Sequence, residues 1–205
     1  MIDWDSCVLW LDSRYFSESY WWDRSKYANN GIVYGAKFKE EGFYFDSDDY
    51  VKVADNNTLD ITDEITIEAL VKPNGHQDNY TMILDKYSTL GYAFELMNSD
   101  VLRFYAKIGG TGQGFNSSEI VTINEKNHIM VTYNGSDGEF FINGKSGGTF
   151  TPSPDGEISS NNYDLYIGYP ISAGKRYKGN LYFIRLYKKS FGLNEAKILA
   201  RNAGF

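Results

Sequence analysis

Two strand-like segments about a dozen residues apart constrain the fold of this chain more than any other feature. In residues 65–73, Ile65, Ile67 and Val71 alternate with polar partners, with Leu70 as an exception, which is the pattern of a half-buried strand. Residues 43–53 form an apolar stretch that breaks at an acidic turn and resumes at Tyr50. Together the two segments predict a β-sandwich.

The composition supports a single all-β domain over residues 1–205. Aromatic residues make up 17% of the chain, and 20 Gly and 4 Pro suit many strands joined by tight turns. A net charge of -7 repels phosphate backbones and anionic lipid, so nucleic acid is excluded as a partner. Apolar runs stay well below the roughly 18 residues of a membrane span. We therefore expect no membrane insertion.

Further strands and turns follow along the chain. Residues 82–86, 92–96 and 101–105 predict strands at intervals near ten residues, as in a sandwich. Asn134-Gly135 and Asn143-Gly144 accept positive φ, so they predict two linked hairpins around a short strand at 139–142. Residues 12–23 are polar and irregular, which predicts a long loop. Asn194 as N-cap predicts a final helix at 195–201.

The order of these motifs resembles the laminin G-like branch of the concanavalin A-like lectin and glucanase superfamily. The resemblance lies in residues 43–53 and 65–71, in His128 with the two Asn-Gly turns, in residues 165–168 and in the closing segment 177–187. It implies an all-β fold: a two-sheet antiparallel jelly-roll sandwich, concanavalin A-like, with a short C-terminal helix.

The aromatic residues of the predicted loop are the first candidate binding site. They are Tyr15, Tyr20, Trp21, Trp22 and Tyr27. Sugars present apolar CH faces that lie flat on exposed rings, while nearby polar side chains bond the hydroxyl groups. The alternative is that the loop folds back, and that Trp21 or Trp22 closes an end of the sandwich or contacts another subunit.

The acidic turn is the second candidate site. Asp46, Asp48 and Asp49 offer the oxygen ligands that calcium takes. The resemblance implies a structural calcium where this turn meets an aspartate on the closing strand, but Tyr182 stands at that position. A solvated acidic turn is the alternative.

Catalysis is not expected. Glu64 and Glu68 lie on one face of a strand, and glycosidases use a pair of carboxyl groups. The resemblance implies a third acid between them in laminarinase-like glucanases, and Thr66 stands there instead. We interpret the two glutamates as ordinary polar-face residues. The single cysteine, Cys7, lies in an apolar segment, which predicts buried packing.

We therefore predict a non-catalytic recognition or adhesion module that binds a glycan or a surface protein. Met1 is followed by no basic residues and no long apolar run, so no signal peptide is expected. Related sandwiches act outside cells, which makes a phage or virus surface protein, such as a decoration or fibre-associated module, one interpretation. The alternatives are a structural assembly protein such as a capsid component, a homo-oligomer or larger assembly, and a glycoside hydrolase.

Overall fold

The structure is a computed structural model that describes residues 1–46, 48–76, 79–168 and 176–205. Its strands are β1 (Cys7–Phe16), β2 (Tyr20–Asp23), β3 (Gly31–Tyr34), β4 (Lys37–Lys39), β5 (Gly42–Phe45), β6 (Tyr50–Val53), β7 (Ile65–Pro73), β8 (Tyr80–Tyr87), β9 (Gly91–Met97), β10 (Val101–Ile108), β11 (Thr111–Ile120), β12 (Asn127–Tyr133), β13 (Gly138–Ile142), β14 (Lys145–Phe150), β15 (Leu165–Ile167) and β16 (Gly179–Tyr187). The helices are two short 3-10 turns, η1 (Trp4–Ser6) and η2 (Asn57–Leu59), and α1 (Leu193–Asn202). Among the described residues, no helix has the length and apolar character needed to cross a membrane.

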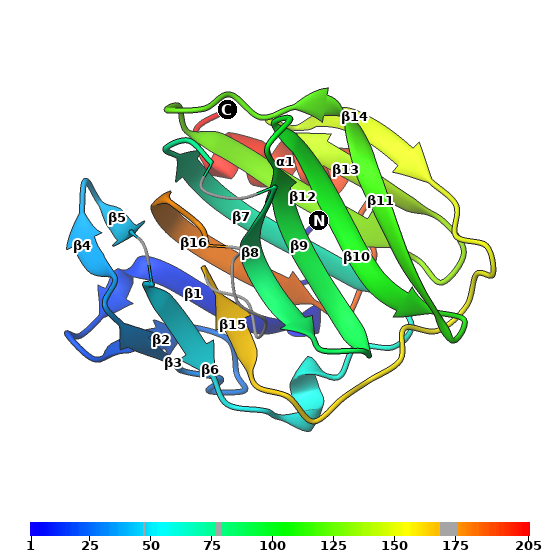
Figure 1. The fold of residues 1–205 in the computed structure, drawn as a ribbon, viewed down its shortest axis with the longest axis horizontal. Coiled ribbons are helices and arrows are strands. Elements are labelled where there is room, and N and C mark those ends of the chain that lie inside the picture. The colour runs from blue at the N-terminus through cyan, green and yellow to red at the C-terminus, as the bar shows by residue number, and fades with distance from the viewer. Residues whose placement is uncertain (47, 77–78, 169–175) are drawn as a thin grey trace.

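The strands pair antiparallel in one continuous hydrogen-bonded ladder. Its order is β11-β10-β9-β8-β15-β6-β3-β2-β1-β16-β7-β12-β13-β14, and β4 and β5 join it where β5 pairs with β16. In Figure 1 the ladder curves round, so that β8, β9, β10 and β11 lie in front of β7, β12 and β13. The all-β prediction is confirmed. The prediction of two separate sheets is not confirmed, because the ladder runs unbroken from one half to the other.

The inward faces of the two halves form one hydrophobic core. Ile65, Ile67 and Val71 of β7 are fully buried in it, as their alternation predicts, and Phe94 and Phe104 reach it from the other half. Successive side chains of a strand point to opposite faces. The intervening residues of β7 therefore lie on the outer surface of the ladder.

The helix α1 covers part of that outer surface. It packs through Ala196 and Leu199 into a second hydrophobic cluster, which also contains Ile2, Cys7, Met130, Phe141, Tyr187 and Phe191. The helix begins before the predicted position: Gly192 is the N-cap, and its N–H donates to the Glu195 carboxylate at 3.3 Å. Asn194 lies inside the first turn instead. Cys7 is buried as predicted, and burial raises the pKa of its thiol to about 12.

Residues 12–23 form a β-hairpin, which corrects the prediction of a long loop. β1 continues to Phe16, β2 begins at Tyr20, and Phe16 pairs with Trp21 across the hairpin. Trp21 is fully buried, whereas Tyr20 and Trp22 on either side of it are exposed. Alternation of buried and exposed residues is the pattern of a strand, but the many polar residues of this segment obscured that pattern in the sequence.

The two hairpins predicted at the Asn-Gly pairs are confirmed. β12, β13 and β14 pair in succession, and β13 is the short middle strand. Asn143 and Gly144 have φ values of 53° and 75°, so the turn uses the left-handed conformation that these residue types accept.

Candidate functional site

Exposed rings gather on the outer surface of β2, β3, β6 and β15. We call this surface the aromatic face and define it by Tyr20, Trp22, Tyr34, Tyr50 and Tyr166. Tyr20, Trp22 and Tyr34 are 39%, 41% and 40% exposed, and Tyr50 and Tyr166 are half-buried. Each ring alternates along its strand with an inward-facing residue, so the local sequence fixes the side on which it lies.

Strand pairing brings these rings together. Tyr34 pairs with Tyr50, and Tyr166 pairs with Lys52, the second residue after Tyr50 on the same side of β6. The Tyr34 and Tyr50 rings stack at 4.6 Å between centroids, and Tyr50 lies 5.9 Å from Tyr166. At the other end Tyr20 and Trp22 stack at 5.0 Å. The result is a row of flat apolar surfaces.

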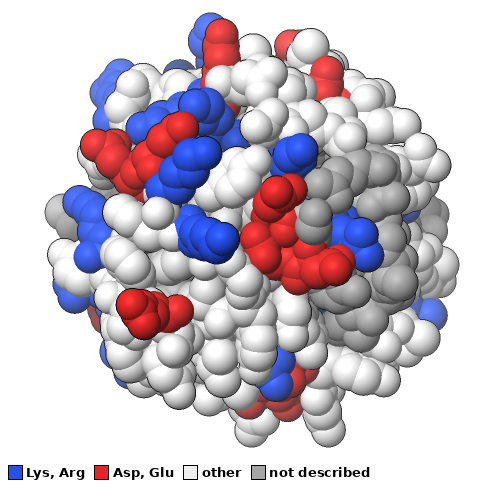
Figure 2. Space-filling view, turned by 60° about the vertical axis from the view of Figure 1, so that its left-hand side comes forward, with Lys and Arg blue, Asp and Glu red and all other residues white. Residues whose placement is uncertain are grey.

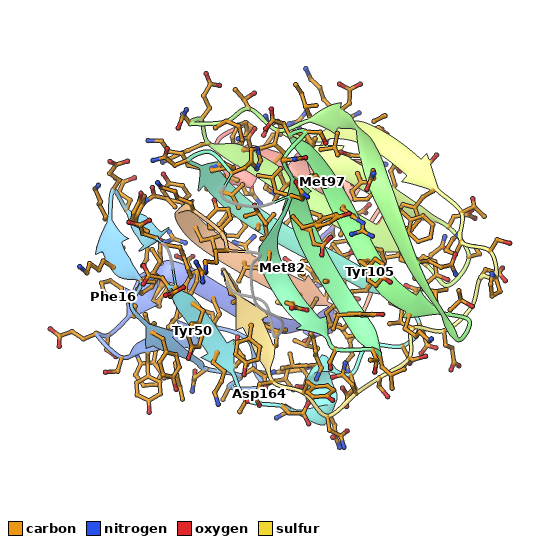
Figure 3. The ribbon with its side chains drawn as sticks, in the orientation of Figure 1. Phe16, Tyr50, Met82, Met97, Tyr105 and Asp164 are labelled. Atoms are coloured by element: carbon orange, nitrogen blue, oxygen red, sulfur yellow. The ribbon has the colours of Figure 1, made fainter. Side chains whose placement is uncertain are left out.

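Polar groups accompany the rings. Lys52 and Asp164 form an ion pair at 3.1 Å, and both side chains are 31% exposed. Figure 3 labels Tyr50, on β6, and Asp164, below β15. Figure 2 shows that charged side chains are sparse over the lower part of this view, where β2, β3 and β6 lie. An aromatic surface with an ion pair beside it can hold a flat apolar body and bond polar groups at its edge.

Asp23 holds the turn that carries the aromatic end of β2. Its carboxylate accepts hydrogen bonds from the backbone N–H groups of Trp10, Ser25 and Asn29, at 2.7 to 2.9 Å. The Asn30 side chain accepts from the Asp23 N–H at 2.9 Å. These bonds tie the residues before β3 to β1 and β2. The exposed rings of β2 therefore project from a fixed backbone.

The same outer surface continues to a second pair of rings beyond β15. Tyr166 pairs with Asp85, Asp85 with Ala93, and Ala93 with Tyr105, which Figure 3 labels on β10. Tyr105 meets Tyr87 edge to face at 4.8 Å. A side chain at position 112 would come within 2.9 Å of the Tyr105 hydroxyl, so Gly112 leaves room for that ring on the surface.

The structure separates the predicted ligand residues. Tyr20 and Trp22 belong to the aromatic face, and Tyr15 is also exposed, with the Arg24 guanidinium 3.8 Å above its ring. Trp21 is in the core, 4.9 Å from Phe43, so its ring is not available at the surface. Tyr27 is half-buried against the same core. Trp21 was expected either to contact a glycan or to fold back into the sandwich, and its buried position agrees with the second interpretation.

Three rings of the aromatic face were missed by the sequence reasoning. Tyr50 and Tyr166 lie in segments that the sequence analysis singled out, beside buried Val51 and between buried Leu165 and Ile167, and Tyr34 follows half-buried Val33. This pattern could have placed them on one outer surface. What the sequence did not contain was the order of the strands, which brings β3, β6 and β15 side by side.

The acidic turn does not bring its three carboxylates together. Asp49 accepts the Asp46 N–H at 2.8 Å, and Asp48 pairs with Arg176 at 2.9 Å. Burial raises the pKa of Asp49. Across the described residues, no group of three or more His, Cys, Asp and Glu side chains is placed to hold a metal. Tyr182, at the position of the expected partner, is buried. Two of the three carboxylates therefore already have partners among the described residues, and a calcium site at this turn stays a prediction.

Glu68 is not an ordinary polar-face residue, which corrects that interpretation. It is fully buried and accepts hydrogen bonds from three side chains. His128 Nε2 lies 2.9 Å away, Tyr187 donates at 2.9 Å, and Arg185 approaches both carboxylate oxygens at 3.1 and 3.2 Å. Glu64 is exposed and accepts the Ser190 N–H at 3.1 Å. The two glutamates are therefore in unlike environments and do not flank a common cleft.

The charge of Glu68 is held by its partners. Burial alone would raise the pKa of this carboxyl, but the Arg185 charge and the hydrogen bonds of His128 and Tyr187 outweigh burial and hold the pKa below its ordinary value. The same pairing raises the pKa of Arg185 despite its burial. A carboxylate so stabilised in its ionised form, and without access to solvent, is suited to holding strands together rather than to proton transfer.

Comparisons with known proteins agree with this architecture. Residues 45–197 match the family model described as "Concanavalin A-like lectin/glucanases superfamily". No curated protein sequence matches the chain. Among solved structures, the binding domain of Paraclostridial Mosquitocidal Protein 1 is 17% identical with a TM-score of 0.74, over 98% of this chain and 53% of that one.

Two botulinum neurotoxin structures are similar in the same way. The serotype D ligand binding domain, in complex with N-acetylneuraminic acid, is 15% identical with a TM-score of 0.74, over 97% of this chain and 51% of that one. The binding domain of neurotoxin DC, in complex with rat synaptotagmin II, is 17% identical with a TM-score of 0.73, over 98% and 52%. The chain thus spans about half the length of these solved structures, and the likeness shows the fold.

Proposed function

We propose that this chain, which belongs to the concanavalin A-like lectin/glucanases superfamily, is a non-catalytic recognition module that binds glycan through its aromatic face. The observation that carries the proposal is the gathering of rings on the aromatic face beside the Lys52–Asp164 pair: Trp22 stacks on Tyr20, Tyr34 stacks on Tyr50, and Tyr50 lies 5.9 Å from Tyr166. A sugar ring buries its CH face on such rings, and the ion pair bonds its hydroxyl groups.

The similar structures support binding as the general role. Their titles describe binding domains, one with a bound sugar acid and one with a bound protein. The partner of the present chain is accordingly a glycan or a surface protein, and the exposed stacked rings favour the glycan. Binding without catalysis is supported by Glu68, because the acid that a hydrolase would need on this strand is buried and bonded on all sides.

The proposal extends to where the module acts. Membership of a lectin-like family supports a place outside cells, and we propose further that the module is an adhesion or decoration module on a cell surface or a virion. The assembly alternative differs in one measurable property, the oligomeric state. Light scattering coupled to size-exclusion chromatography separates the two: a monomer that retains glycan supports the module, and an obligate oligomer that binds no glycan supports an assembly protein.

A glycan array tests the binding proposal with two matched tryptophans. Trp22 and Trp4 are 41% and 44% exposed, and each stacks on one ring, Tyr20 at 5.0 Å and Trp10 at 5.2 Å. Only Trp22 belongs to the aromatic face. We expect Trp22→Ala to weaken glycan binding about tenfold, which is about 1.4 kcal/mol, and Trp4→Ala to leave it unchanged. Equal effects of the two substitutions would remove the aromatic face as the site.

A further inference from the structure

A hollow of about 450 Å³ lies on the outer surface of the ladder, where α1 ends and no longer covers the strands. Its floor is a third small hydrophobic cluster, Leu70 of β7 with Tyr182 and Phe183 of β16, against which Ala203 packs. β1, the turn between β4 and β5, and Lys126 complete its walls. The volume is within the range of small-molecule sites.

Each aromatic ring of the floor lies beside a cation. The guanidinium carbon of Arg185 is 4.2 Å from the centroid of Phe183, and the Lys126 ammonium is 4.4 Å from the centroid of Tyr182. Rings in these positions stabilise the charges of the two cations. The hollow therefore combines an apolar floor with two positive groups held at fixed places.

Arg185 keeps unused hydrogen-bonding capacity at this floor. The residue is only 8% exposed, and its bonds to Glu68 both come from one terminal nitrogen, Nη1. Within the described chain, Nε of Arg185 is buried without a hydrogen-bond partner. A guanidinium carries five N–H donors in a planar fork that matches a carboxylate. Arg185 also lines the hollow, where its charge can meet an anion.

The two acids that line the hollow each pair with a cation other than Arg185. Asp12 accepts three hydrogen bonds from Arg14, at 2.5 to 3.0 Å, so its charge is locally compensated. Glu41 is 3.7 Å from Lys126 with 87% of its side chain exposed, a weak pair that leaves Lys126 able to take another partner. A doubly charged phosphate would be repelled by both acids, whereas a single carboxylate is tolerated.

We propose that this hollow binds a sugar that carries one carboxylate, the class of the uronic acids. The carboxylate bonds to Arg185 and Lys126, and the apolar side of the sugar ring lies against Phe38, which is 46% exposed at the wall. Glu41 and Asn202 line the rim, where a sugar presents its hydroxyl groups. None of the five rings that define the aromatic face lines this hollow.

The test is an NMR titration of the isotope-labelled chain with three small probes. Methyl glucuronide carries the sugar ring and the carboxylate, methyl glucoside carries the ring alone, and N-acetylalanine carries a carboxylate on a peptide-like body. We expect methyl glucuronide to bind at least tenfold more tightly than either of the others and to shift the amide signals of Lys126 and Ala203. Equal binding of the glucuronide and the glucoside would overturn the carboxylate assignment, and N-acetylalanine binding as tightly as the glucuronide would overturn the sugar assignment.

Two lysines of similar exposure test whether methyl glucuronide binds in this hollow. Lys126 and Lys189 have side chains that are 48% and 47% exposed, and each pairs with one acid, Glu41 and Asp3. We expect Lys126→Glu to weaken methyl glucuronide binding at least tenfold and Lys189→Glu to leave it unchanged, with melting temperatures confirming that both variants fold. Unchanged binding in Lys126→Glu would overturn the proposal. Trp22→Ala should leave glucuronide binding intact, so failure of the aromatic face and failure of this hollow give different results.

Discussion

Beneath α1, charges and rings are packed away from water, whereas on the aromatic face rings of the same kind stay exposed. Both regions are outer surfaces of one ladder, and both arise from the alternating residues of its strands. Under the helix, Tyr187 and Phe191 are buried and Glu68 is bonded by three side chains. On the aromatic face, Tyr20, Trp22 and Tyr34 are covered by no described element and stack on their neighbours.

The difference shows that composition alone does not assign a role to a residue. A tyrosine or an acid on the covered surface contributes to folding, and the same residue type on the uncovered surface is available to a partner. The comparison makes opposite predictions for the two surfaces: substitutions under α1 should change stability, and substitutions on the aromatic face should change binding.

The largest effect is expected at Glu68. Glu68→Gln removes the charge that compensates buried Arg185, and breaking a buried ion pair costs about 3–5 kcal/mol. The free energy of unfolding in urea measures this cost. Glu64→Gln is the matched control, because Glu64 is exposed, and we expect it to change stability by less than about 0.5 kcal/mol. Similar stabilities for the two variants would show that the covered cluster does not hold the strands together.

The next largest effect on stability is expected at Trp21, and its neighbour Trp22 allows a buried and an exposed tryptophan of the same strand to be compared. Trp21→Ala removes a fully buried ring from the core and should cost about 3 kcal/mol, at the low end of the range because Phe43 can move into part of the space. Trp22→Ala loses mainly its stacking on Tyr20 and should cost about 1 kcal/mol. Chemical denaturation of the two variants measures the difference. A larger loss for Trp22 would contradict the assignment of inner and outer faces.

Lowering the pH should remove the stabilisation that Glu68 gives to the surface covered by α1. The pKa of Glu68 is held below its ordinary value of 4.5, so the unfolded chain binds a proton more readily than the folded chain. The stabilisation from Glu68 is therefore present above about pH 4.5 and is lost as the pH falls through the lower, folded pKa. The melting temperature as a function of pH should fall less steeply in Glu68→Gln than in the native chain. If the melting temperatures of the two proteins fell equally steeply with pH, Glu68 would not be the cause of the acid sensitivity.

The smallest effect is expected from calcium. Asp48 is paired with Arg176 and Asp49 bonds the turn backbone, so a calcium ion would have to displace both contacts. We expect calcium or EGTA to shift the melting temperature by less than about 1 °C, because a ligand stabilises the folded chain only where its concentration is comparable to or above its dissociation constant. A rise of several degrees with calcium, lost in Asp46→Asn, would instead establish a calcium site at this turn.

The sequence predicted the fold where the signal was local. Alternation in residues 65–73 and positive-φ residues at Asn143-Gly144 were sufficient for β7 and for the hairpins of β12 to β14. In residues 12–23 the same signal was present but was outweighed by polarity, so a hairpin was predicted as a loop. The helix was placed correctly within two residues, but its N-cap is Gly192 and not Asn194.

The sites were less predictable, because they depend on contacts far along the chain. Glu68 meets His128 across 60 residues and Arg185 across 117, so its burial leaves no trace in the segment around it. The aromatic face was predicted only in the part that lies on β2. Its other rings come from β3, β6 and β15, and their neighbourhood follows from the strand order.

Cys7 is buried beneath α1, and burial raises the pKa of its thiol to about 12, so we expect this thiol to react only slowly with thiol reagents at neutral pH. A cysteine introduced beside either proposed site would therefore be labelled alone, without first removing the native one. A fluorophore or spin label placed in this way could report on each surface separately, in a protein whose sequence and packing are otherwise unaltered.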